Sequence, residues 1–143
     1  MNQKINSHVT LQTLPRTLEN FIAWDDERGI TKGSSAQAQW EKLFEEVIEL
    51  YAALNPQTHS ISIRNEIIQR AYALYEAGKI KAIPKGDDPQ EHVTDAVGDS
   101  LKCLTSVANL SNVDIAKSAY DVLQVINART GTLDPNTGIW NKD

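Results

Sequence analysis

Two acidic motifs, far apart in the sequence, hold the residue types best suited to chemistry. They read Glu45-Glu46-Val47-Ile48-Glu49 and Asp95-Ala96-Val97-Gly98-Asp99. On a helix, acids at i, i+3 or i, i+4 face the same side, so each motif can present two carboxylates to one point. Carboxylate oxygens are the ligands that Mg²⁺ and Mn²⁺ prefer. The pair therefore predicts a hard divalent cation held between two helices, a kind of site whose usual substrate carries phosphates.

A solvated helix face is the competing interpretation of both motifs. On a helical wheel, the acids of the first motif lie opposite an apolar arc of Trp40, Phe44, Val47 and Tyr51. In the same way, Asp95, Asp99 and Lys102 lie opposite the apolar arc of the second helix. Asp99 and Lys102 can also form an ordinary i, i+3 ion pair. Four carboxylates at about 4 Å would repel by about 4 kcal/mol per adjacent pair at an effective dielectric near 20, so a shared site requires a cation.

The elements that must position these acids are predicted to be helices. Apolar spacing and capping signals predict about five of them, and a turn sequence at 134–138 predicts a small C-terminal hairpin. The helices are expected from Thr13 to just before Gly29, from the Ser34 capping box to Asn55, from about Ser60 to Ala77, from Asp88 to about Asn109, and from the Ser111 capping box through Ile126. The fold class is therefore all-α, a helical bundle. We expect one compact domain over 1–143, with 1–12 a lead-in segment and 131–143 a C-terminal tail.

Composition narrows the class of protein. The chain has 143 residues, 14 basic and 19 acidic, and its net charge of −5 argues against binding duplex nucleic acid. The single Cys103 allows no disulfide within one chain and is expected to be a small buried core residue. Residues 1–12 lack the apolar core of a signal peptide, and no apolar run reaches the roughly 20 residues that span a bilayer. We expect a soluble, cytoplasmic protein.

At these motifs the chain resembles the MazG-like nucleoside triphosphate pyrophosphohydrolases, members of an all-α group that also contains dimeric dUTPases. That family carries Glu-Glu-x-x-Glu on one helix and an acid-x-x-Asp motif on a later one. The first motif matches position by position, and Gly98-Asp99 followed by Leu101 matches the end of the second. The departure is Ala96, which stands where the family most often has Glu, with Asp95 one residue earlier. The resemblance covers about Leu18 to Lys142.

The resemblance implies hydrolysis of a nucleoside triphosphate, most naturally a deoxynucleoside triphosphate, to the monophosphate and pyrophosphate in clearance of the nucleotide pool. It implies Mg²⁺, with Mn²⁺ as the alternative, and a homodimer or homotetramer. The implied metal ligands are Glu46, Glu49, Asp95 and Asp99. The implied catalytic residues are Glu45, which would orient or deprotonate water, and Glu46, Glu49 and Asp99. The implied substrate-binding residues are Lys102, Asn127, Arg129 and Lys142.

Two alternatives stay open. One is a non-catalytic helical module that binds nucleotide or another protein and in which Ala96 marks a lost ligand. The other is a dUTPase-like specificity within the same fold. Among the aromatic residues, Trp24 and Trp40 can stack on a base, although the apolar arc favours Trp40 as core. The segment from Lys79 to Asp87 is expected to be a loop, with a role as a lid or specificity loop.

Overall fold

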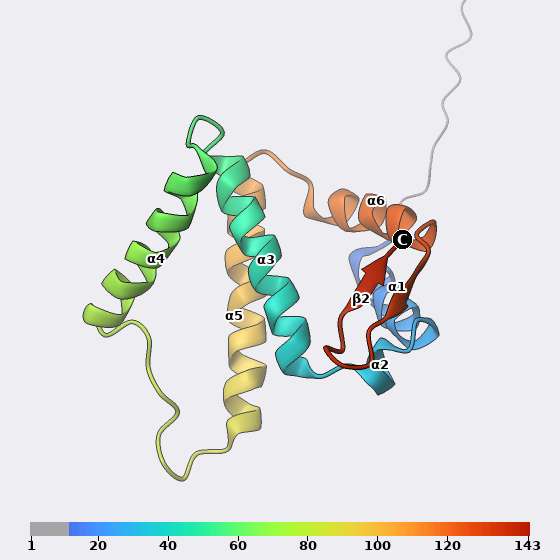
Figure 1. Ribbon diagram of the computed structural model, residues 1–143, viewed down its shortest axis with the longest axis horizontal. Helices are drawn as coiled ribbons and strands as arrows, with labels where there is room; N and C mark the ends of the chain where they lie inside the picture. The colour runs from blue at the N-terminus through green and yellow to red at the C-terminus, as the bar shows by residue number, and fades with distance from the viewer. Residues whose placement is uncertain (1–11) are drawn as a thin grey trace, which may run out of the picture. The chain divides into compact units, whose positions relative to one another are not determined.

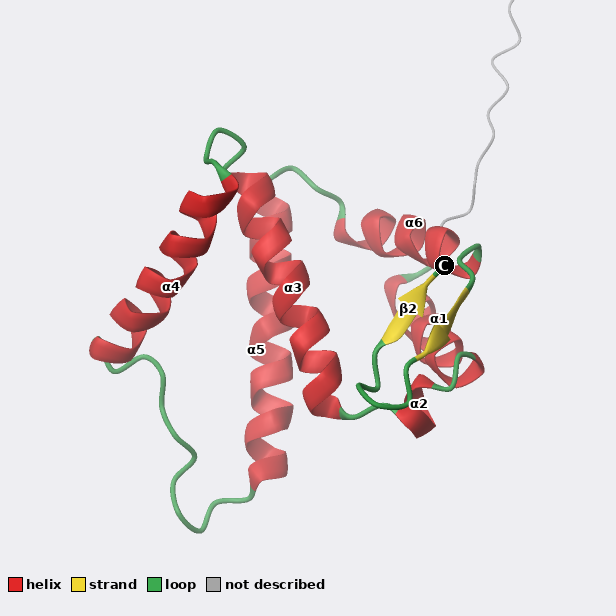
Figure 2. Ribbon diagram, viewed as in Figure 1, coloured by secondary structure: helices red, strands yellow, loops and turns green. Residues whose placement is uncertain are grey.

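The computed structural model describes residues 12–143 and is mostly helical (Figures 1 and 2). Its elements are α1 (Leu14–Glu27), α2 (Ile30–Gly33), α3 (Ala36–Leu54), α4 (Ser60–Glu76), α5 (Pro89–Leu110), α6 (Ile115–Asn127), β1 (Gly131–Leu133) and β2 (Trp140–Lys142). The predicted all-α class with a short C-terminal hairpin is confirmed. The expectations for residues 1–11 lie outside the described part of the chain.

Most helix ends follow the local signals. Pro15 lies in the first turn of α1, α3 ends before Asn55-Pro56, and Gly78 follows α4 with a φ of 66°. That left-handed backbone conformation suits glycine, which has no Cβ to clash. The short helix α2 was not predicted. It follows Gly29, whose φ of 77° ends α1 and redirects the chain.

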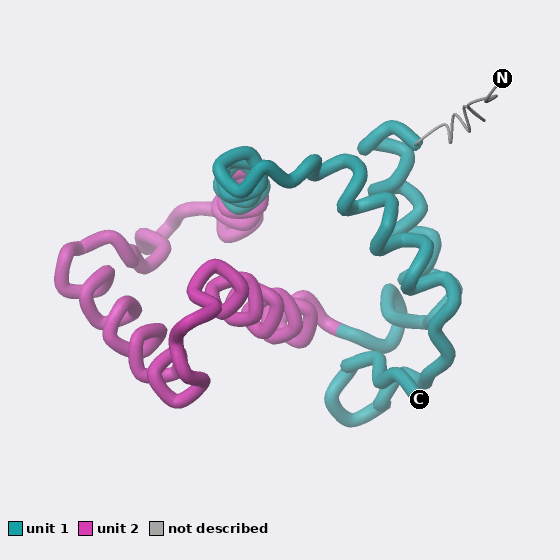
Figure 3. The backbone as a smooth tube through the Cα atoms, turned by 90° about the horizontal axis from the view of Figure 1, so that it is seen from above, with its two compact units in different colours: residues 1–34, 100–143 teal, residues 35–99 magenta. Residues whose placement is uncertain are grey.

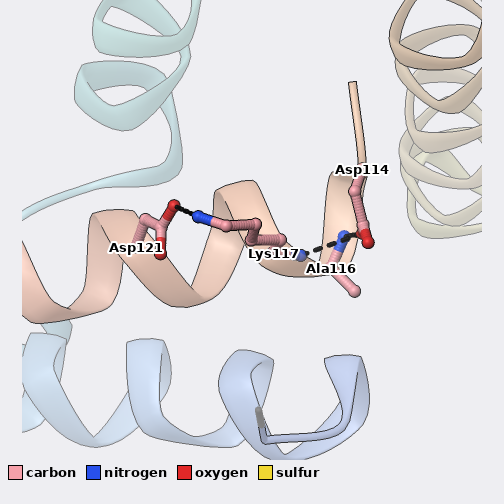
Figure 4. A network of polar contacts seen from close by, with 4 residues as sticks. All are labelled: Asp114, Ala116, Lys117 and Asp121. Atoms are coloured by element: carbon pink, nitrogen blue, oxygen red, sulfur yellow. Dashed lines mark hydrogen bonds and ion pairs between the residues drawn. The ribbon is translucent and has the colours of Figure 1, made fainter. Parts of the chain in front are cut away.

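Two predicted capping boxes are shifted. Helix α3 is capped by Ser35, whose hydroxyl accepts a hydrogen bond from the Ala38 N–H at 3.1 Å. Helix α6 is capped by Asp114, and Figure 4 shows its Oδ1 accepting from the N–H groups of Ala116 and Lys117, each at 3.0 Å. The expected start at Ser111 is therefore three residues early. Residues 111 and 112 instead form a turn in which Asn112 has a positive φ of 55°.

The chain divides into two compact units, coloured in Figure 3. Unit 1 comprises Met1–Ser34 and Ser100–Asp143, and unit 2 comprises Ser35–Asp99. Unit 1 has eight acidic and eight basic residues, whereas unit 2 has eleven acidic and six basic residues, a difference of −5. All of the net charge therefore lies in unit 2. The assignment of 1–143 to a single functional domain stays a prediction.

In unit 1, α1 packs against α6 and α2, and β1 pairs antiparallel with β2. The side chains of Thr17, Ile30 and Leu123 are buried at the centre of this packing. The indole of Trp24 lies edge-on to that of Trp140, with ring centroids 5.1 Å apart, and its Nε1–H donates to the carbonyl of Ile126 at 3.1 Å. These contacts connect α1 to both the hairpin and the end of α6.

In unit 2, α3 packs against α4. The Tyr51 hydroxyl donates to Glu66 at 2.5 Å and accepts from the Arg70 Nε–H at 3.2 Å, and the Arg70 guanidinium lies 5.4 Å from the Tyr51 ring centroid. The hydrogen bond between Arg70 and the Tyr51 hydroxyl is the main cause of the raised pKa of Arg70. Only Ala38 and Ile63 are buried among the apolar residues of this unit. The hydrophobic core of unit 2 is therefore small.

Two expectations about burial are wrong in this structure. Cys103 is exposed on α5, and Trp40 is 53% exposed, so neither belongs to a core within this chain. Every residue of α5 from Val93 to Thr105 is exposed, so the apolar residues of that helix are uncovered over this stretch. None of the helices in residues 12–143 has the length and apolar character needed to cross a membrane.

Candidate metal and phosphate site

The first acidic motif lies in the middle of α3, and its three acids are exposed. Glu45 forms an i, i+3 ion pair with Lys42, whose Nζ lies 2.5 Å from Oε2. Within the described chain, Glu46 and Glu49 make no ion pair or side-chain hydrogen bond. These two carboxylates are therefore available to a ligand, whereas Glu45 would have to exchange Lys42 for one.

Glu49 does not lie opposite the apolar side of α3 as the helical wheel indicates. It borders an apolar hollow of about 490 Å³ between α3 and α4. The hollow is lined by Phe44, Ile48, Glu49, Ala52, Ser60, Ile63, Arg64, Ile67 and Ile68. The wheel misplaced Glu49 because α4 packs against one flank of the apolar stripe of α3 and not against its middle.

The second acidic motif lies in the first half of α5. The Asp88 carboxylate starts this helix by accepting from the Gln90 N–H at 3.0 Å, as its capping signal predicts. Asp95 and Asp99 then line an open, shallow hollow of about 390 Å³ together with Glu91, Thr94 and Gly98. All five residues belong to one helix, so the hollow has a floor and no opposite wall.

Glu91 is the acid that the sequence analysis missed. It begins an i, i+4, i+8 row with Asp95 and Asp99. Four residues of helix advance about 6 Å, so the row follows one side of α5 at intervals of about 6 Å. A Cβ added at Gly98 would meet no atom within 4 Å, so the glycine leaves space beside the row.

The structure does not gather the acids of the two motifs. In residues 12–143 no three His, Cys, Asp or Glu side chains lie close enough together to hold a metal ion. Inside unit 2, the residues of α5 up to Asp99 have no packing on α3 or α4 comparable to that between α3 and α4. The donor atoms fit Mg²⁺ in their chemistry, since all are carboxylate oxygens. Their positions in one chain do not yet form its coordination shell.

The predicted substrate-binding residues fall outside unit 2. Lys102 is exposed on α5 three residues after Asp99, and no ion pair joins the two in the described chain, so its ammonium group is available. Asn127 is the last residue of α6, and Arg129 follows it. Lys142 pairs in register with Gly131, so Arg129 and Lys142 lie at the same end of the hairpin. These two cations are exposed and belong to unit 1.

The two candidate base-stacking tryptophans differ in availability. The Trp24 ring already contacts Trp140, and the Arg28 guanidinium lies 5.2 Å from its centroid, so Trp24 is a structural residue of unit 1. The Trp40 ring is stacked on Phe44 at 5.4 Å with an interplanar angle of 4°, and about half of its surface is open to solvent. Of the two, Trp40 is the more accessible to a ligand or partner.

Comparisons with known proteins identify no relative of this chain. No family model, no curated protein and no solved structure matches the chain.

Proposed function

We propose that this protein is a metal-dependent nucleoside triphosphate pyrophosphohydrolase. The observation that supports the proposal most strongly is the state of the carboxylates. Glu46, Glu49, Asp95 and Asp99 are exposed, have no side-chain partner in the described chain, and belong to the same unit. They can therefore accept a cation without first breaking an ion pair, unlike Glu45, which is paired with Lys42. The resemblance of both motifs to the MazG-like family supports the same conclusion.

In the proposed reaction, water hydrolyses the bond between the α and β phosphates, and the products are a nucleoside monophosphate and pyrophosphate. Glu46, Glu49, Asp99 and Asp95 would hold Mg²⁺ or Mn²⁺, which when bound neutralises phosphate oxygens and lowers the pKa of water. Glu45, released from Lys42, would orient or deprotonate the water. Lys102, Asn127, Arg129 and Lys142 would bind the nucleotide, the cations through charge-assisted hydrogen bonds to phosphate.

A deoxynucleoside triphosphate is the proposed substrate, and removal of surplus or noncanonical nucleotides in the cytoplasm is the proposed role. One observation favours the alternative, a helical module that binds nucleotide or protein without turnover. The described acids of a single chain do not assemble a metal site, and Ala96 replaces the commonest acid of the second motif. Product formation separates the two, because a binding module leaves the triphosphate intact.

The test is product analysis with the full chain, Mg²⁺ or Mn²⁺, and each common NTP and dNTP in turn. Phosphorus NMR distinguishes monophosphate plus pyrophosphate from diphosphate plus phosphate. We expect the first pair from at least one substrate, and the panel, which includes dUTP, also ranks the bases. The second pair of products from every active substrate would contradict the proposed bond. No turnover with any nucleotide would favour the binding module.

Variants assign the reaction to the acids. Glu49→Gln and Asp99→Asn are expected to lower turnover about a hundredfold or more, with helix content unchanged, because each removes charge from the reacting site but leaves the helix surface intact. Glu45→Gln is expected to slow turnover without loss of metal binding. Glu76→Gln, which changes an exposed acid at the end of α4, is the matched control and should keep full activity. Equal losses in the control and the motif variants would remove the motifs from the mechanism.

A further inference from the structure

The hollow between α3 and α4 borders the first acidic motif, and Glu49 belongs to both. On α3 its lining runs from Phe44 to Ala52, which is about 12 Å along the helix axis. Its volume of about 490 Å³ is within the range of about 300–1,000 Å³ that small-molecule sites have. The hollow is therefore large enough for a ligand and adjacent to a carboxylate that is proposed to hold metal.

The lining of the hollow is almost entirely apolar. Helix α3 contributes Phe44 and Ile48, and α4 contributes three isoleucines, Ile63, Ile67 and Ile68. Ile63 is buried, whereas Phe44 and Ile68 are 44% and 50% exposed, so the apolar lining continues from the core of unit 2 to its surface. The hollow thus offers mainly aliphatic and aromatic contacts, which suit a planar ring system and not a charged group.

We propose that this hollow holds the base of the nucleotide substrate, with the triphosphate directed toward the acids of α3. A nucleoside triphosphate has a planar base at one end and a charged polyphosphate at the other. Unit 2 has the matching order, because the apolar hollow is followed at Glu49 by the exposed carboxylates that are proposed to share a metal with phosphate. The inference rests on the proposed function for the direction of the triphosphate, but occupancy of the hollow can be measured without turnover.

In this arrangement Phe44, and neither of the two tryptophans, contacts the base. A base can stack on the phenyl ring, since every base has a π-face. Trp40 does not line the hollow and stacks on the Phe44 ring at 5.4 Å, so it would support the stacking ring without binding the base itself. Trp24 belongs to unit 1, where it contacts Trp140.

Methyl NMR of the full chain labelled at isoleucine tests the inference. Of the described residues, four isoleucines line the hollow, namely Ile48, Ile63, Ile67 and Ile68. Ile115 and Ile126 on α6 report on unit 1. The ligands, each added with Mg²⁺, are deoxynucleoside triphosphates in which NH replaces the α,β-bridging oxygen and prevents hydrolysis, and inorganic tripolyphosphate, which has no base. We expect the methyl signals of the hollow to shift with at least one of these nucleotides and not with tripolyphosphate.

Ala52 and Ala53 provide a matched pair of variants. Ala52 lines the hollow, whereas Ala53 is the next residue of α3, is exposed and does not line it. Ala52→Leu places a larger side chain in the hollow and should weaken binding of the nucleotide about tenfold or more, with binding of tripolyphosphate unchanged. Ala53→Leu should bind both ligands as the unmodified chain does.

Several results on the unmodified chain would overturn the inference, so it does not depend on whether a variant folds. Equal shifts with the nucleotide and with tripolyphosphate would do so, because phosphate alone would then account for them. Shifts confined to Ile115 and Ile126, or no shift with any nucleotide, would also do so. Hollow signals that change with protein concentration and not with nucleotide would assign the hollow to a second copy of the chain. Turnover without shifts in the hollow would contradict only this inference, and shifts without turnover would contradict only the proposed function.

Discussion

Replacing Trp24 by Phe tests how unit 1 is held together. The Trp24 Nε1–H donates to the Ile126 carbonyl at 3.1 Å, and that carbonyl also accepts from the Arg129 N–H at 3.0 Å. The carbonyl therefore keeps one partner in the variant, and the lost hydrogen bond should cost only about 1 kcal/mol. A smaller ring weakens the edge contact with Trp140 and the contact with Arg28, which adds about 1 kcal/mol. The expected total is about 2 kcal/mol of unfolding free energy.

Amide hydrogen exchange in α6 is the suitable assay, because Trp24 contacts the end of that helix. Where exchange reports the opening equilibrium, 2 kcal/mol corresponds to protection factors about thirtyfold lower across α6. Trp40→Phe is the matched control in unit 2 and should leave α6 protection unchanged. If α6 protection changes less than about twofold in Trp24→Phe, or falls equally in Trp40→Phe, then Trp24 does not connect α1 to α6 as described.

Two further predictions concern unit 1. Burial raises the pKa of Asp25, and the negative charge of neighbouring Asp26 raises it further. Between the unfolded and the folded pKa, the folded state therefore holds a proton on Asp25 that the unfolded state has lost. The unfolding free energy should then decrease as pH rises from about 4 through the raised pKa. Urea titrations at several pH values should show this decrease, and Asp25→Asn should remove it. Asp114→Ala should lower the unfolding free energy by about 1 kcal/mol, because it removes the side-chain cap of α6. Ser111→Ala should leave the unfolding free energy almost unchanged in the same urea titration. Equal decreases in the two variants would indicate that α6 starts at Ser111.

Local signals were sufficient to predict the five longer helices and the C-terminal hairpin, although two helix starts were shifted. Capping side chains, Pro15 in a first turn and Gly78 after a last turn act within a few residues, so their effects can be read from the sequence without knowledge of the packing. The hairpin was predictable for the same reason, since Asp134 accepts a hydrogen bond from the Asn136 N–H at 2.8 Å inside the turn. This bond is the main cause of the lowered Asp134 pKa. The short α2 was missed because one helical turn carries too little periodicity.

The sequence by itself also determined which residues could do the proposed chemistry, because i, i+3 and i, i+4 spacing places acids on one side of any helix. It could not decide which apolar stripes are covered. Trp40 and Cys103 have the same apolar character whether buried or exposed, and only tertiary packing distinguishes the two states. Nor could it decide whether Glu49 and Asp99 meet, since that depends on contacts between distant helices. The structure leaves those stripes uncovered within one chain.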